Sequence, residues 1–204
     1  MPKTENILSG LHSVANTYAG YAISWHAVIY LLLVLLLFKW TPSNRFFGIF
    51  MALPLVSVAV LAWISGNPFN GSLFALAAIT VFILAILAPG QVALSPAPYF
   101  IAGILMVIIG MVYPHFLETN SVFPYLYASP FGLIPCPTLM VLIGFALMFN
   151  GMGSQGIFIT LIILGLFYGL FGVLKLAVYL DIILLLGTMI FMARYFIMIR
   201  NQAF

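Results

Sequence analysis

Six side chains that could carry chemistry stand at or near the ends of long apolar segments of this sequence. They are His26, His115, Glu118, Cys136, Lys175 and Asp181. Ionisable groups are costly at membrane depth unless they are paired, so such residues are candidates for function in a membrane protein. With the membrane segments predicted below, all six are expected near one membrane face, and the opposite face keeps only basic residues. We predict that these six residues form the candidate functional cluster of the protein.

Metal and haem binding are two chemistries that such a cluster allows. Cys136, His115, His26 and the nearby Met140 would suit a soft ion such as Cu(I). A haem held by His26 and His115 is a second arrangement. The sequence has no tight ligand spacing such as CxxC or HxxxH, and no nucleophile elbow, HExxH motif or usefully spaced carboxylate pair. We therefore predict no catalysis, and no cofactor other than bound lipid.

Each candidate also has a purely structural interpretation. Lys175 and Asp181 flank one tight turn, where their charges suit the helix dipoles, and a structural pair is favoured there. His115 and Glu118 are three residues apart beside a predicted loop, where water would solvate both. A lone histidine such as His26 more often hydrogen-bonds to a neighbouring helix than binds a ligand.

The composition identifies the class of protein whose elements must position these residues. Of 204 residues, 65% are hydrophobic and 4% are charged, whereas a soluble domain carries about 25% charged residues. The chain is therefore expected to be an integral membrane protein. Its net charge of +3 comes from six dispersed basic residues, which is too sparse for nucleic acid. Its single cysteine cannot form an internal disulfide bond.

Apolar runs long enough to cross a membrane predict an all-α bundle with about seven spans. The segment 1–19 is expected to be an interfacial amphipathic helix, because its apolar residues recur at helical spacing. Residues 20–200 are expected to form a single transmembrane helical domain. The predicted spans are 20–39, 46–65, 71–89, 97–117, 132–150, 155–175 and 178–199.

The distribution of basic residues predicts the orientation. Four of them fall on one side of the predicted membrane and two, Lys3 and Lys175, on the other, which favours the first side as cytoplasmic. The N-terminus would then be outside and the C-terminus inside. The loss of one span would reverse this assignment. The four residues on the predicted cytoplasmic side are Lys39, Arg45, Arg194 and Arg200.

Prolines predict helix breaks at Pro54, Pro114, Pro135 and Pro137. The fifth span is expected to become helical at about Pro137, with Cys136 near the N-cap. From there to Asn150 is about 21 Å of helix, which is shorter than the ~30 Å hydrocarbon core. The segment "FGLIP" should therefore enter the membrane in a non-helical conformation, buried in protein or lining a wet cavity. The helix N-terminus would lower the pKa of the Cys136 thiol and apolar burial would raise it, and the sequence leaves both open.

Small residues at regular spacing predict a close helix contact. Gly165, Gly169 and Gly172 follow one another at about one helical turn. The contact is either ordinary packing within the bundle or a face for self-association or another subunit.

Several long segments of the chain resemble an uncharacterised family of bacterial multi-spanning membrane proteins. They are "GYAISWHAVIY", "AWISGNPFNGSLFALAAITVFILAI", "VYPHF", "FPYLYASPFGLIPCPTLMVLIGF" and "YGLFGVLKLAVYLDIILLL". The most specific part is "PFGLIPCPT", with Pro130, Phe131, Gly132, Pro135, Cys136, Pro137 and Thr138. The family is known as a domain of unknown function, and its members are sometimes labelled permeases. The resemblance implies a bacterial-type inner-membrane location and brings no residue role.

Three functions remain open at this level. The first is a non-catalytic accessory or assembly subunit that packs in a larger membrane complex or oligomer, because the spans are apolar around much of their circumference. The second is a small permease for a solute or metal ion, which would use the broken helix near Cys136. The third is a redox or copper-handling membrane protein built on Cys136.

Overall fold

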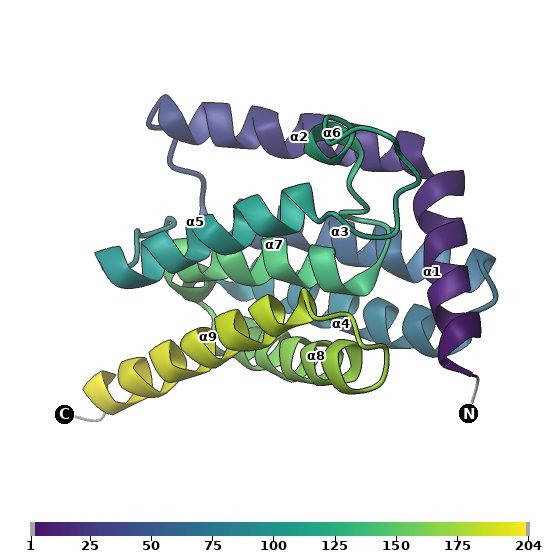
Figure 1. Cartoon of the computed structure of the whole chain (residues 1–204). Coiled ribbons are helices and arrows are strands. Elements are labelled where there is room, and N and C mark those ends of the chain that lie inside the picture. The colour runs from purple at the N-terminus through teal and green to yellow at the C-terminus, as the bar shows by residue number, and fades with distance from the viewer. Residues whose placement is uncertain (1–2, 203–204) are drawn as a thin grey trace.

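The protein is a bundle of helices in a computed structural model (Figure 1), and the structure describes residues 3–202. Apart from an isolated bridge between Ser43 and Gln91, the regular elements within that range are all helical, which confirms the predicted all-α class. They are α1 (Thr4–Thr17), α2 (Ala19–Leu37), α3 (Asn44–Ile64), α4 (Pro68–Leu87), α5 (Ala97–Val112), α6 (Tyr125–Ala128), α7 (Pro135–Met148), the 3-10 helix η1 (Asn150–Gly153), α8 (Gln155–Leu174) and α9 (Asp181–Gln202).

Five of these helices are long and apolar enough to cross a membrane, namely α2, α3, α4, α8 and α9. The predicted fourth and fifth spans are shorter apolar helices, α5 with 16 residues and α7 with 14. At ~1.5 Å per residue these rise about 24 and 21 Å, less than a ~30 Å hydrocarbon core. Each of the seven predicted spans corresponds to one helix, with ends that differ by a few residues, but only five of these helices have spanning length.

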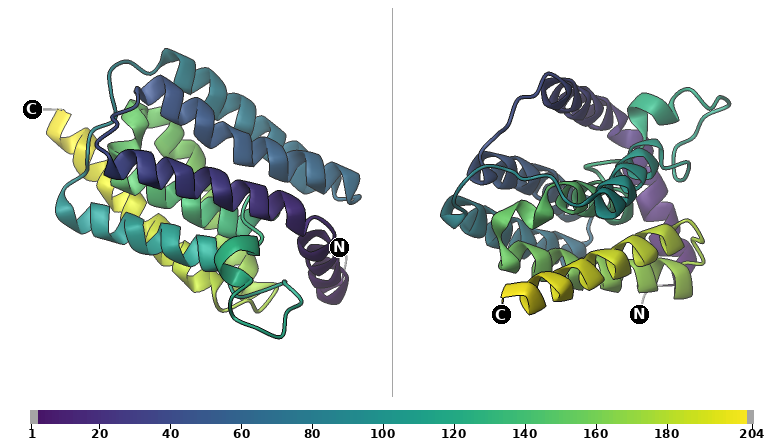
Figure 2. Two further views of the ribbon diagram at one scale, coloured as in Figure 1. Left: turned by 90° about the horizontal axis from the view of Figure 1, so that it is seen from above. Right: turned by 90° about the vertical axis from the view of Figure 1, so that its left-hand side faces the viewer.

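The seven helices run back and forth, so their connections gather at two ends of the bundle (Figures 1 and 2). The α1 end holds α1 itself, the 65–67 turn, the 113–134 segment and the 175–180 turn. The α9 end holds the 38–43 and 88–96 connections, η1 and the last turns of α9. α1 lies across its end of the bundle and runs in a different direction from α2, as Figure 1 shows. Residues 1 and 2 of the predicted N-terminal segment lie outside the described range.

α7 forms the centre of the bundle. All of its residues are buried except Cys136, which is partly exposed. It contacts α3, α5, α8 and α9, and it crosses α5 where two glycines meet. A Cβ built on Gly144 would lie 2.7 Å from the Gly103 carbonyl oxygen, so both positions need glycine. Because α7 is surrounded by protein, its length need not match the thickness of a bilayer.

The prolines act differently along the chain. α3 continues through Pro54, so the break predicted there does not end the helix. Pro114 follows the end of α5 at Val112, and the predicted span 97–117 is therefore too long. His115 and Glu118 consequently lie in the connecting segment rather than in a helix.

The start of α7 differs by two residues from the prediction. The helix begins at Pro135 and has Ile134 as its N-cap, so both prolines and Cys136 lie in its first turn. The preceding residues are non-helical and buried, as predicted for "FGLIP". Gly132 has φ +76°, and its N–H donates to Thr138 Oγ1 at 2.9 Å. The Thr138 hydroxyl in turn donates to the Ile134 carbonyl at 2.7 Å, which ties the segment to the helix.

The same segment also seats α2. Gly132 lies directly under the Trp25 ring, where a Cβ would overlap the indole. Phe131 makes edge-on contacts with Trp25 and His26, at 6.0 and 6.3 Å between ring centroids. Residues of the "PFGLIPCPT" motif therefore pack against α2 before the motif enters α7.

The glycine-spaced face of α8 is covered by α9 of the same chain. A Cβ on Gly165 would overlap Thr188, one on Gly169 would lie 3.2 Å from Leu185 Cβ, and one on Gly172 would overlap Asp181. The structure thus matches packing within the bundle. The surface predicted for self-association is filled by the chain itself.

Candidate functional site

Asp181 is placed by the tight turn that joins α8 to α9. Ala177 takes a left-handed conformation, with φ +55°, and the Val178 N–H donates to the Gly172 carbonyl at 3.0 Å. The turn therefore folds the first residue of α9 back against α8. A Cβ at Gly172 would overlap Asp181 Oδ2, so the carboxylate occupies the space that glycine leaves.

Tyr113 provides the clearest partner of this carboxylate. It is the C-cap of α5, immediately before Pro114, and it is fully buried. Its hydroxyl donates a hydrogen bond of 2.7 Å to Asp181 Oδ1. The Tyr113 carbonyl accepts from the Ser129 hydroxyl at 3.3 Å, which fixes the end of α5 against the start of the "PFGLIPCPT" segment.

Cys136 approaches the same carboxylate from α7. Its thiol lies close enough to the Asp181 carboxylate to interact with it, although Cys136 is partly exposed and Asp181 is only 1% exposed. Tyr168 of α8 is close to the thiol, and its hydroxyl donates to Asn70 Oδ1 of α4 at 2.8 Å. The side chains from the end of α5 and from α4, α7, α8 and α9 therefore form a row of neighbouring polar groups inside the bundle. We call Tyr113, Cys136 and Asp181 the Asp181 cluster.

The predicted ion pair between Lys175 and Asp181 is wrong. Among residues 3–202 the single ion pair joins His12 to Glu118. Lys175 is exposed, and its carbonyl accepts from the Thr4 hydroxyl at 3.3 Å. The direction of the turn explains the difference, because it buries the aspartate under α5 and leaves the lysine outside.

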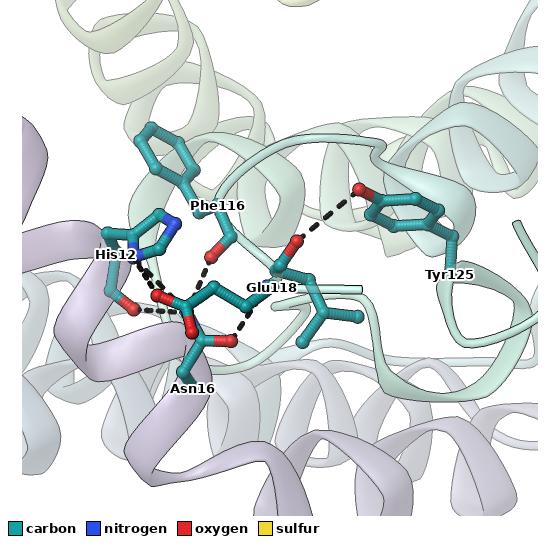
Figure 3. Close-up of polar contacts among 6 residues, drawn as sticks. His12, Asn16, Phe116, Glu118 and Tyr125 are labelled. Carbon is teal, nitrogen blue, oxygen red and sulfur yellow. Dashed lines mark hydrogen bonds and ion pairs between the residues drawn. The ribbon is translucent and has the colours of Figure 1, made fainter. Parts of the chain in front are cut away.

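A second polar group ties α1 to the segment that follows α5 (Figure 3). Asn16 donates to the Phe116 carbonyl at 2.9 Å and accepts from the Glu118 N–H at 2.8 Å. His12 Nδ1 lies 3.3 Å from Glu118 Oε1. We call His12, Asn16, Phe116 and Glu118 the α1 clasp. The hydrogen bond from the Thr4 hydroxyl to the Lys175 carbonyl adds to the clasp. Together they attach α1 to the 113–134 segment, which begins with Tyr113, and to the 175–180 turn, which precedes Asp181.

His115 lines an open pocket next to the clasp. The pocket has a volume of about 750 Å³ and lies between α1 and residues 114–125. Partial burial and the nearby His12 lower the pKa of His115 below its ordinary value. The lining is mixed, and comprises Leu8, Ser9, His12, Ser13, Pro114, His115, Phe116, Glu118 and Tyr125.

His26 belongs to neither group. It is buried in α2, and its ring nitrogens lie 2.8 Å from the carbonyl oxygens of Ala22 and Met111. The Met111 carbonyl is free to take this contact because α5 ends one residue later. His26 therefore links α2 to α5, as the structural interpretation of a lone histidine proposed.

The weak metal candidates are not brought together. Both ring nitrogens of His26 face carbonyl groups, and Met140 packs against Gly110 on α5. In the described part of the chain no group of three or more His, Cys, Asp or Glu side chains has the geometry to hold a metal ion. The four residues proposed for Cu(I) therefore do not form one site.

All six candidate residues do lie on elements of the α1 end or, for His26, close to it, but they separate into distinct groups. Cys136 joins Asp181, Glu118 joins His12 with His115 nearby, and Lys175 stays outside. The sequence patterns did not predict that Tyr113, His12 and Asn16 belong to these groups. The position of Tyr113 directly before Pro114 was the one available signal, since a proline there marks the end of a helix.

The Asp181 cluster places three groups that can bind a proton side by side, namely the Tyr113 hydroxyl, the Cys136 thiol and the Asp181 carboxylate. The arrangement can therefore hold a proton between neighbouring groups. The sequence matches no protein-family model and no curated protein, and the fold matches no solved structure.

Proposed function

We propose that the chain is a non-catalytic integral membrane protein that packs as an accessory or assembly subunit in a larger membrane complex or oligomer. The observation that supports this most is an apolar surface formed by α2 and the 119–128 segment. The Tyr30 hydroxyl donates to the Leu126 carbonyl and joins the two parts. Exposed side chains of this α2–α6 surface include Leu31, Val122, Phe123, Leu126 and Tyr127.

The 119–124 part of this surface argues for a protein partner rather than lipid tails. These residues are non-helical, apart from turns, and irregular backbone does not face hydrocarbon because its polar groups would be unsatisfied. Val122 and Phe123 are nevertheless 74% and 73% exposed. Large apolar side chains exposed next to one another outside the hydrocarbon are typical of a contact surface.

Mass measurement of the intact assembly tests this proposal. The chain, purified from its host in mild detergent, should retain another protein chain or a second copy of itself. Replacing Val122 and Phe123 with serine should release that partner. The matched control is Phe69→Ser, at a residue of the same end that is 61% exposed but lies on α4. A wild-type monomer without any co-purifying chain contradicts the proposal.

A small permease is the second candidate, and the Asp181 cluster is the observation that favours it. A buried carboxylate lies beside the proline-marked start of α7, which follows a non-helical buried segment, and interrupted helices are common at transport sites. In proteoliposomes, uptake of a solute or metal ion should then fall strongly in Asp181→Asn and Cys136→Ser. Uptake that is unchanged by both substitutions contradicts transport through this cluster.

The proposed location is a bacterial-type inner membrane with the α1 end outside. Its support is the resemblance described above and the basic residues Lys39, Arg45, Arg194 and Arg200, all of which belong to elements of the α9 end. That end would face the cytoplasm.

A further inference from the structure

The charged side chains are divided unequally between the two ends of the bundle. Glu5, Glu118 and Asp181, the three acidic residues of the sequence, belong to elements of the α1 end. The α9 end carries four of the six basic residues and no acidic side chain. Its positive charge therefore has no acidic side chain nearby to balance it.

Arg194 of this end is held by two contacts of its guanidinium group. Its Nη2 donates to Asn150 Oδ1 at 2.8 Å, and its guanidinium carbon lies 5.0 Å from the centre of the Tyr99 ring. Asn150 is fixed in turn, because its N–H donates to the Ser95 hydroxyl at 3.0 Å. The contacts of Arg194 thus come from α5 and η1, and both groups are neutral.

The guanidinium lacks a counter-charge within the described residues. The side chain is half-buried, and its Nε is inaccessible and has no hydrogen-bond partner in the 3–202 range. Arg194 also falls within the α9 segment that has spanning length. A charge in that position is costly unless an anion pairs with it.

A phospholipid provides the anion that fits this setting. The planar guanidinium matches phosphate oxygens in a two-point contact, and anionic lipids attract basic residues at a membrane surface. The helices that hold Arg194 also expose apolar side chains, Ile101 and Leu105 on α5 and Ile190 and Ile197 on α9. Acyl chains can cover these side chains while the phosphate lies at the guanidinium.

We propose that Arg194, oriented by Asn150 and Tyr99, binds the phosphate of an anionic phospholipid at the α9 end of the bundle. The site is independent of the partner surface on α2 and the 119–128 segment, so one can fail without the other. The site binds the phosphate of a phospholipid, whose acyl chains lie on the apolar side chains nearby, rather than free phosphate.

Native mass measurement with added lipid tests the proposal on the full chain. Detergent-solubilised protein is titrated with phosphatidylglycerol, with phosphatidylcholine and with inorganic phosphate. The wild type should prefer phosphatidylglycerol, and Arg194→Gln should weaken its binding about fivefold, since one basic residue at an anionic surface is worth about 1 kcal/mol. Phosphatidylcholine should bind more weakly, and inorganic phosphate should not compete.

Two further variants keep the test decisive. Asn150→Gly removes the amide that orients the guanidinium but suits the left-handed backbone at that residue, φ +53°, and it should also weaken the preference. Lys175→Gln removes an exposed charge at the opposite end and should bind lipid like the wild type. Equal binding of phosphatidylglycerol by wild type, Arg194→Gln and Asn150→Gly overturns the proposal. Competition by inorganic phosphate overturns its assignment to a lipid.

Discussion

The Tyr113 hydroxyl donates a 2.7 Å hydrogen bond to Asp181 Oδ1 and so joins the last turn of α5 to the first residue of α9. These residues are 68 positions apart in the chain. Both are buried, and the Cys136 thiol of α7 lies close to the same carboxylate. Three helices therefore meet at this carboxylate at the α1 end.

Loss of this hydrogen bond should destabilise the protein. Tyr113→Phe leaves the buried carboxylate with one donor fewer, which costs about 1–3 kcal/mol. Asp181→Asn should have a similar effect, and the double variant should lose less than the sum of the two, because directly interacting residues are coupled. Thermal unfolding in detergent measures all three variants. Tyr179→Phe is the control, since Tyr179 is exposed. Additive losses in the double variant would contradict a direct bond.

Gly172 should be sensitive to a single added methyl group. Gly172→Ala places a Cβ where Asp181 Oδ2 now lies, and overpacking of this kind costs about 1–3 kcal/mol. For a chain of this size the midpoint of thermal unfolding should fall by roughly 2–10 °C. Gly20→Ala is the matched control, because a Cβ there meets nothing within 4 Å. Equal midpoints for the two variants would show that Asp181 does not occupy the space beside Gly172.

The contribution of His115 to the stability of the α1 end should be lost in acid. Burial and His12 lower the pKa of His115, so the folded protein binds fewer protons there than the unfolded chain. The stability contributed by neutral His115 is present above the ordinary histidine pKa of about 6.5 and is lost as the pH falls through the lower folded value. The protection of the α1 amides against hydrogen exchange, after correction for the pH dependence of the intrinsic exchange rate, should therefore fall between about pH 7 and about pH 5.

His115→Gln removes the titrating group and should flatten this pH dependence. His12→Gln is the companion variant. It removes the neighbour that lowers the pKa of His115, and should shift the remaining transition toward higher pH. A corrected protection of α1 that falls in His115→Gln as it does in the wild type would place the acid response at another residue.

Labelling of Cys136 should be slow but should occur from the α1 end. The thiol is partly exposed and lies close to the Asp181 carboxylate. An impermeant thiol reagent added to intact cells should modify it at least about tenfold more slowly than a cysteine introduced at the exposed Asn120. The Asn120→Cys variant is made with Cys136→Ser. Labelling of both positions only after the cells are opened would reverse the proposed orientation.

Hydrophobic runs predicted the helices well. Backbone N–H and C=O groups inside a membrane must form hydrogen bonds within the helix, so a long apolar run in the sequence indicates a helix directly. The limits of α5 and α7 were less predictable. Pro114 reads equally as a kink or an end, and the structure has the helix end before it. At α7 the prolines occupy the first turn itself, so the helix starts earlier than the restriction on Cys136 indicated.

The sequence predicted which end of the bundle holds the candidate site, but it did not predict which residues of the site contact one another. Sequence spacing placed Cys136 and Asp181 at the same end, because both stand where an apolar segment begins. It could not show that the 175–180 turn buries Asp181 and leaves Lys175 outside, since that depends on the left-handed Ala177. Asn16 and His12 carry no sequence signal for contact with Phe116 and Glu118, about a hundred residues later.

Photo-crosslinking from Phe123 in intact cells tests the proposed role as a complex subunit most directly. A photoreactive phenylalanine analogue replaces Phe123 in one variant and Phe69 in the other, two exposed aromatic positions of the same end. The account predicts a covalent adduct with another protein chain, or with a second copy, from position 123 and not from position 69. Adducts with lipid alone from both positions would contradict it.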